Sequence, residues 1–327
     1  MTSELPPSHQ TASKDKRDFQ ALFQNAGWKK VEAPRSWVRF RNDADANGLC
    51  WHVPASDTPL VSVIIPTADA DRGGYFNKLM ASLTAQEMQD FELIVLKGDR
   101  RQGRGINISA DLAKGRYLLT LDDDSSLPDS KTLNKLVDAM EQHADIGMAG
   151  GNNTVPEWAT PFVKRVMRQV PRRSWEPVKE MVDSDLAEHP CLIMRTELFR
   201  QVGGENECIP RGLDPYLRKV FRDAGSRVVV LPDIIYHHLP PENWKKLLTQ
   251  FYRNGYQAAF ANIHHPEWVI ETPATHGEFV EKVPLWRRLL RYPIRMIGSL
   301  LSGQWVWLIC QFCYAWGFLY GWLRERK

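Results

Sequence analysis

The sequence lacks the features that mark several classes of protein. Its formal net charge is only +3 and no dense run of lysine and arginine occurs in it, so we expect no nucleic-acid partner. Its five cysteines are odd in number and scattered, which argues against a disulfide framework and favours a reducing compartment. Cys310 and Cys313 form a C-x-x-C pair in an apolar segment, where buried small side chains explain them better than a redox or metal site.

The chain also lacks internal repeats and an apolar run near its N-terminus. The first 18 residues therefore predict a disordered tail rather than a signal peptide. Within the next forty residues, FQALFQNAG predicts a short helix, and SWVRFRN and GLCWHVP predict short strands. We expect four parts along the chain: the tail (1–18), an N-terminal extension (19–59), a main domain (60–262, with halves 60–151 and 152–262) and a C-terminal helical region (263–327).

Strand and helix patterns alternate from Leu60 onward. LVSVIIP is a continuous β-branched run, as expected of a strand buried on both faces of a parallel sheet. YFNKLMASLTAQEM follows with apolar residues at helical spacing, and then come the strands FELIVL, RYLLTLD and IGMAGG with helical segments between them. This alternation predicts a doubly wound α/β sheet with right-handed crossovers.

The C-terminal region contains a long uncharged stretch. Residues 296–323 hold no charged side chain and many tryptophans and tyrosines, with arginines beyond both ends. As one helix the stretch would extend ~42 Å, enough to cross a ~30 Å hydrocarbon core with some tilt. It is typical of a membrane span or of a helix lying in the membrane plane, and the pattern does not separate the two. A buried core helix or subunit interface is the alternative.

Three adjacent carboxylates, Asp122, Asp123 and Asp124, end the predicted strand RYLLTLD. Like charges repel, so a cation is expected beside them, and ligands of open α/β sheets bind at the carboxyl ends of the strands. Carboxylate oxygens suit Mg²⁺ or Mn²⁺, which bind one or two protein carboxylates together with substrate phosphates. Asp122 and Asp124 therefore predict a metal site for a diphosphate. The alternative is a solvated turn in which Asp124 caps the loop that follows.

Three blocks of the sequence follow one another over about residues 60–238. They are VSVIIPT, GRGINISADLAKGRYLLTLDDDSSLPD and VGGENECIPRGLDPYLRKVFRDAGSRVVVLPDIIYHH. In this order they resemble the first strand, the Asp-x-Asp signature and the acceptor-side block of the family 2 glycosyltransferases of the GT-A fold. The resemblance implies a GT-A fold, a Rossmann-like architecture with a mixed, mostly parallel sheet that binds nucleotide-diphospho-sugars.

The resemblance also implies a reaction and roles for single residues. An inverting transferase moves a sugar from a nucleotide-sugar donor to an acceptor hydroxyl, and Asp214 is its implied general base. A helix N-cap, with proline at the first helical position, is the alternative for Asp214. Asp122 and Asp124 are the implied ligands of Mg²⁺ or Mn²⁺, and His238 or His237 is a third ligand or else a loop histidine bonded to backbone.

Nucleotide recognition departs from the pattern of the family. Many members carry an acid at the end of the second strand, where this chain has Lys97, which either meets phosphate or is solvated. The nucleotide therefore stays open. Residues expected to contact the donor are Thr67, Asp69, Asn107 and Asp123.

Together these features predict a metal-dependent glycosyltransferase on the cytoplasmic side of the cell membrane. Its acceptor would be a saccharide or lipid-linked molecule, as in the assembly of cell-surface polysaccharide or glycolipid. Two other functions remain open at this point. The missing acid after the second strand favours a non-catalytic nucleotide-sugar-binding or scaffold protein, and the acidic strand end also suits a nucleotidyltransferase.

Overall fold

The structure is a computed structural model and describes residues 16–170, 177–270, 276–277, 279 and 284–326. Most of the expected tail, residues 1–15, lies outside this set. The strands form one sheet in the order β1-β2-β4-β3-β5-β9-β7-β10-β6, with β8 paired to β10. Their bounds are β1 Lys29–Lys30, β2 Leu49–Val53, β3 Val61–Thr67, β4 Phe91–Lys97, β5 Tyr117–Thr120, β6 Ser125–Ser126, β7 Ile146–Asn153, β8 Val182–Asp183, β9 Leu192–Arg195 and β10 Arg227–His238.

The five main strands run in one direction. β3 is parallel to β4 and β5, and β10 is parallel to β7. β9 is antiparallel to both β5 and β7, so these two strands also share a direction. The expected mixed, mostly parallel sheet is confirmed, and the carboxyl ends of β3, β5, β7 and β10 meet at one edge.

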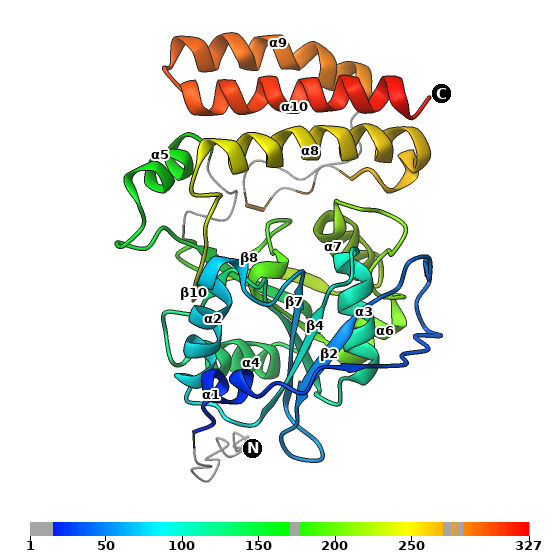
Figure 1. The fold of residues 1–327 in the computed structure, drawn as a ribbon, viewed down its shortest axis with the longest axis vertical. Coiled ribbons are helices and arrows are strands. Elements are labelled where there is room, and N and C mark those ends of the chain that lie inside the picture. The colour runs from blue at the N-terminus through cyan, green and yellow to red at the C-terminus, as the bar shows by residue number, and fades with distance from the viewer. Residues whose placement is uncertain (1–15, 171–176, 271–275, 278, 280–283, 327) are drawn as a thin grey trace, which may run out of the picture.

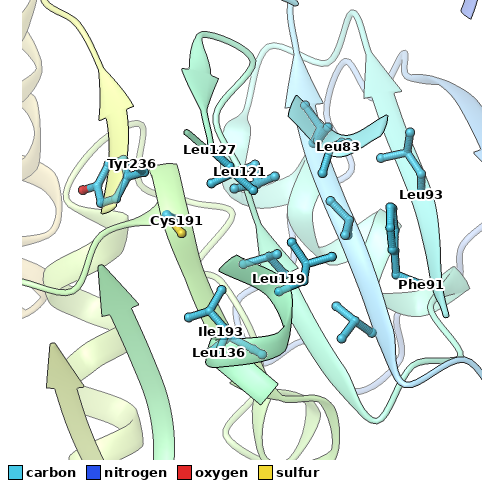
Figure 2. Packing of buried hydrophobic residues seen from close by; sticks show 14 of the residues in the cluster. Leu83, Phe91, Leu93, Leu119, Leu121, Leu127, Leu136, Cys191, Ile193 and Tyr236 are labelled. Carbon is cyan, nitrogen blue, oxygen red and sulfur yellow. The ribbon is translucent and has the colours of Figure 1, made fainter. Parts of the chain in front are cut away.

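Helices cover both faces of the sheet because side chains alternate along each strand. Val61, Val63 and Ile65 of β3 join a cluster under α1, α2 and α4, whereas Ile64 joins a second cluster under α3, α6 and α7. Figure 2 shows part of the first cluster, where Leu119 of β5 lies close to Ile193 of β9. The helix bounds are α1 Phe19–Gln24, α2 Tyr75–Thr84, α3 Gln102–Leu112, α4 Thr132–Gln142, α6 Thr196–Gln201 and α7 Leu213–Asp223.

The N-terminal extension contributes structure to the main sheet. The short helix α1 and the strand GLCWHVP are confirmed, and β2 pairs antiparallel with β4. The strand expected for SWVRFRN is wrong, because this segment forms turns. Its polar groups bond to the loop after α6: the Arg39 amide donates to the Gly203 carbonyl at 3.0 Å, and the Asn42 amide donates to Glu207 Oε2 at 2.8 Å.

The C-terminal region forms a separate helical layer, seen at the top of Figure 1. The single helix expected for residues 296–323 is wrong: the stretch is divided between α9 (Leu285–Leu301) and α10 (Trp305–Arg324). The break falls at Gly303, whose φ of 68° belongs to the left-handed region that glycine adopts easily. α10 packs along α8 (Trp244–His264), which lies between α10 and the sheet domain, with α5 (Pro161–Gln169) at one end.

Glycines allow α8 and α10 to approach closely. A Cβ atom added at Gly317 would lie 2.0 Å from the carbonyl oxygen of Tyr252, and one added at Gly255 would lie 1.9 Å from that of Tyr314. Backbone therefore touches backbone at these crossings. Since α8 begins at Trp244, shortly after β10 ends at His238, the helical layer stands on the side of the sheet where the main strands have their carboxyl ends.

Candidate active site

The aspartates that follow β5 meet the last residue of β10. His238 Nε2 lies 2.9 Å from Asp124 Oδ1 and 3.6 Å from Asp122 Oδ2. One ligand atom from each of these residues lies within 4.8 Å of the other two. Two carboxylates and an imidazole suit Mn²⁺ or Mg²⁺ by their chemistry, so the residues present fit the expected ion. The juxtaposition arises because β5 and β10 end at the same edge of the sheet.

An arginine supplies the positive charge that the three aspartates require. Arg72 Nε lies 3.1 Å from Asp123 Oδ1, and Arg72 Nη2 lies 3.1 Å from Asp124 Oδ2. Arg72 stands in a tight loop with a φ of 53°, followed by Gly73 and Gly74, which also have positive φ. The sequence analysis missed this residue. Its signal was the pair of glycines directly after it, which marks a turn at the end of β3.

Burial disfavours the ionised forms of Asp122 and Asp123 and so raises their pKa values. It raises the pKa of Asp123 to about 6, although the hydrogen bond from Thr67 and the charge of Arg72 oppose the shift. Burial also raises the pKa of Asp122, against the attraction of His238. A group of carboxylates with raised pKa at a strand end is the kind of cluster that a divalent cation stabilises.

The residues predicted to contact the donor occupy different environments. Thr67 Oγ1 donates to Asp123 Oδ2 at 2.6 Å, so Thr67 and Asp123 belong to the acidic cluster. Asp69 is exposed, and its Oδ1 accepts the amides of Asp71 and Arg72 at 3.0 Å each, which shapes the Arg72 loop. Contacts of Thr67, Asp69 and Asp123 with the nucleotide-sugar donor stay a prediction.

Asn107 is buried and has a structural task. Its Nδ2 donates to the Glu205 carbonyl at 2.9 Å and to Glu207 Oε1 at 3.0 Å, and its Oδ1 accepts the Glu205 amide at 2.9 Å. Both ends of the side-chain amide thus bind the loop after α6. The surface amide considered as the alternative is wrong, because Asn107 is fully buried, and its nucleotide contact stays a prediction.

Two other expected phosphate or metal contacts point elsewhere. Lys97 Nζ lies 4.0 Å from the centre of the Trp28 ring, so the ammonium group makes a cation–π contact with the N-terminal extension. His237 Nδ1 lies 2.9 Å from the Thr154 carbonyl oxygen, and burial lowers the pKa of this histidine. Of the two histidines left open by the sequence, His238 is the one that faces the aspartates.

Asp214 is held by a buried histidine that the sequence analysis missed. His189 Nδ1 lies 2.5 Å from Asp214 Oδ1, and the His189 amide donates to the same oxygen at 2.8 Å. On its other side, His189 Nε2 lies 2.7 Å from Glu205 Oε1. Asp214 is not the N-cap that the sequence allowed: Gly212 occupies that position, and α7 begins at Leu213. Nothing in the family pattern marks His189, so only its distance to Asp214 reveals it.

The two groups of side chains adjoin each other. Thr120, the last residue of β5, donates through Oγ1 to the carbonyl oxygen of His189 at 3.1 Å. Asp122 follows two residues later, and the charges of His189 and Asp214 contribute to its pKa. The acidic strand end and Asp214 therefore belong to one site.

Comparison with known proteins finds a family match for part of the chain. Residues 81–203 match the family model described as Glycosyl transferase family 2. The resemblance read from the sequence is confirmed. The family 2 match includes Asp122, Asp124 and His189 and ends before Asp214 and His238. A comparison with curated proteins finds no match.

Solved structures give the fold. The chain is similar to the mannosyltransferase PcManGT from Pyrobaculum calidifontis, solved in complex with GDP-Man and Mn²⁺, with a TM-score of 0.53 and 13% identity over 94% of this chain and 96% of that chain. A further match is S. aureus TarS 1-349 in complex with UDP-GlcNAc, with a TM-score of 0.43 and 17% identity over 62% of this chain and 66% of that chain. The first likeness confirms the GT-A fold class. The family match supports a glycosyltransferase.

Proposed function

We propose that the protein is a metal-dependent, inverting glycosyltransferase that transfers a sugar from a nucleotide-diphosphate donor to an acceptor hydroxyl. One observation carries the proposal: a carboxylate–imidazole cluster and Asp214 lie in one site at the carboxyl edge of the sheet, joined through Thr120 and His189. Direct displacement at a sugar carbon needs a group that stabilises the leaving diphosphate and a base beside the acceptor. The site offers both.

The residues divide the work between the two sides of the sugar. Asp122, Asp124 and His238 would hold Mn²⁺ or Mg²⁺, which neutralises charge on the diphosphate when it is bound. Arg72 stands beside the same carboxylates and supplies a guanidinium for phosphate oxygens. Asp214 accepts the proton of the acceptor hydroxyl as the new C–O bond forms at the anomeric carbon, and the bond from that carbon to the diphosphate breaks.

The comparisons support this proposal at a coarser level. The family match supports glycosyl transfer, and PcManGT, which shares the fold, was solved with GDP-Man and Mn²⁺. A donor of the same class, a nucleotide-diphosphate sugar, is the substrate class we propose. Saccharide or lipid-linked molecules are the proposed acceptors, because the helical layer stands on the same side of the sheet as the site.

We also propose that the helical layer rests in the plane of a membrane. By length and composition α10 is the one described helix that could cross a bilayer, which alone is weak evidence. Its backbone contacts with α8 oppose a span, because α8 carries two lysines, an arginine, two asparagines and a histidine that a lipid core would not accept. The outer surface suits a headgroup region instead: Trp286, Leu290 and Ile294 are more than half exposed.

Charge on α9 identifies the preferred lipid. Residues 284–324 contain five arginines and no acidic residue. Three of them form what we call the arginine stripe: Arg287, Arg291 and Arg295, which recur every fourth residue and are exposed. A cationic stripe beside exposed apolar side chains complements a membrane of anionic lipid.

A donor panel tests the transferase proposal. We expect UDP-, GDP- or dTDP-sugars to raise the melting temperature of the protein in the presence of Mn²⁺, and one of them to be turned over. Asp124→Asn should abolish both the Mn²⁺-dependent shift and the turnover. Asp129→Asn is the matched control, because Asp129 lies on the same loop but pairs with Lys135. Metal-dependent binding without turnover, with any acceptor or with water, would favour a non-catalytic binding protein.

A further inference from the structure

Asp214 belongs to a chain of buried polar groups that reaches back into the domain. Asn107 fixes the backbone of Glu205 through two hydrogen bonds, and Glu205 Oε1 faces His189 Nε2 at 2.7 Å. His189 Nδ1 then faces Asp214 Oδ1 at 2.5 Å. The side chains of His189 and Glu205 are 3% and 0% exposed, whereas that of Asp214 is 33% exposed and opens toward solvent.

We propose that His189 and Glu205 are positioning residues, which clamp Asp214 so that one carboxylate oxygen is fixed and the other is presented to the acceptor hydroxyl. This inference rests on the proposed function of Asp214 as general base. Oδ1 takes both hydrogen bonds from His189, and Oδ2 accepts none from the part of the chain that the structure describes. Oδ2 is thus the oxygen that receives the proton, while His189 keeps its own.

Two carboxylates on one imidazole require that both ring nitrogens carry protons. Each nitrogen lies within hydrogen-bond distance of a carboxylate oxygen, and an ionised carboxylate can only accept. His189 is therefore an imidazolium, and the clamp carries a net charge of −1 from two carboxylates and one cation. Although burial works against its charge, the carboxylates of Asp214 and Glu205 raise the pKa of His189 well above its ordinary value.

The clamp has an effect on Asp214 that sequence alone does not suggest. Burial works to raise the pKa of Asp214, but the His189 charge and hydrogen bonds outweigh it and hold that pKa far below its ordinary value. Asp214 thus stays ionised in mildly acidic solution. The other charged groups that act on the clamp are Arg218 on α7 and Asp122 after β5, and both stay in place when His189 is changed.

The clamp can be tested on the whole protein with His189→Asn and Glu205→Gln, which keep polar groups of similar shape. In His189→Asn we expect kcat to fall about 10- to 100-fold, because the Asp214 carboxylate is no longer held in one orientation. The KM for the donor should change little. The acid limb of kcat/KM should move to higher pH, since Asp214 loses the cation that keeps it ionised. Glu205→Gln should change both quantities in the same directions by a smaller amount.

A control and a direct measurement separate positioning from simple stability. His52→Asn alters another histidine–carboxylate pair, 2.7 Å from Glu92 and away from the site, and should leave the pH profile unchanged. NMR of ¹⁵N-labelled histidine should show His189 protonated on both ring nitrogens at pH 7, with or without substrate.

The outcomes distinguish this inference from the proposed function. A neutral His189 ring at pH 7, or an acid limb in His189→Asn that coincides with that of the wild type, would overturn the clamp even in an active enzyme. A doubly protonated His189 and the expected shift of the acid limb support it. If the wild-type protein transfers sugar from no donor, the proposed function fails first, and the positioning role fails with it whatever the NMR shows.

Discussion

Arg72 places its positive charge beside the carboxylates of the proposed metal site. We therefore expect a change at Arg72 to alter the affinity of the donor-free protein for metal. The guanidinium shares Asp124 with the proposed metal site, and a second contact joins it to Asp123, both at 3.1 Å. A divalent ion beside His238 would therefore bind, through Oδ1, a carboxylate whose charge the arginine already partly neutralises through Oδ2. Arg72→Met should strengthen Mn²⁺ binding in the absence of donor.

The magnitude follows from the exposure of the pair. The Arg72 side chain is 50% exposed, so each contact is screened by water and contributes about 0.2–1 kcal/mol. Two such contacts contribute about 0.4–2 kcal/mol, which corresponds to an apparent Kd for Mn²⁺ that falls about 2- to 30-fold. Donor affinity should change in the opposite direction, because Arg72→Met removes a guanidinium that would meet phosphate oxygens.

Isothermal titration calorimetry with MnCl₂, first without and then with a nucleotide-sugar, measures both effects. Arg116→Met is the matched control, because Arg116 stands beside β5 at the opposite end of that strand and pairs with Glu141 on the surface. It should alter neither affinity. A folded Arg72→Met protein that binds Mn²⁺ no better than the wild type would refute the idea that arginine and metal compete for the charge of Asp124.

Three further predictions concern charge burial, the membrane and helix packing. The pKa of Asp123 is raised to about 6, so the free energy of unfolding of the metal-free protein should fall as pH rises from about 4 to 6. Asp123→Asn should remove about 2–3 kcal/mol of that fall in urea titrations at several pH values. Replacing the arginine stripe by glutamate should abolish co-sedimentation with vesicles containing phosphatidylglycerol, and wild-type protein that resists alkaline carbonate extraction would instead indicate a span. Gly317→Ala should destabilise the protein by about 1–3 kcal/mol in urea, whereas Gly298→Ala, where nothing lies within 4 Å, should not.

The fold could be predicted because its signals are local. The β-branched run of β3 and the helical spacing of Phe76, Leu79 and Leu83 each identify an element without help from the rest of the chain. The errors arose where distant contacts decide the structure. SWVRFRN forms turns because the amides of Arg39 and Asn42 bond to Gly203 and Glu207. Residues 296–323 divide at Gly303 because α10 returns along α8.

The candidate site shows the same division. Asp122, Asp124, His238 and Asp214 were named from motifs, and the structure brings the first three together beside the fourth. Arg72, His189 and Glu205 were not predicted, because each acts through a contact with a residue far away in the sequence. Asn107 was named for a nucleotide, but the structure shows it bonded to the loop that carries Glu205.

The central claim is that one site holds a metal for the donor diphosphate and Asp214 as the base for the acceptor. Its most direct test is the rate of sugar transfer by Asp214→Asn, measured together with the Mn²⁺-dependent binding of the donor. The account predicts that the variant binds donor and metal as the wild type does, while kcat falls about 10²- to 10⁴-fold through loss of the proton acceptor. Transfer at the wild-type rate would contradict the account, and so would loss of metal-dependent donor binding in a variant that remains folded.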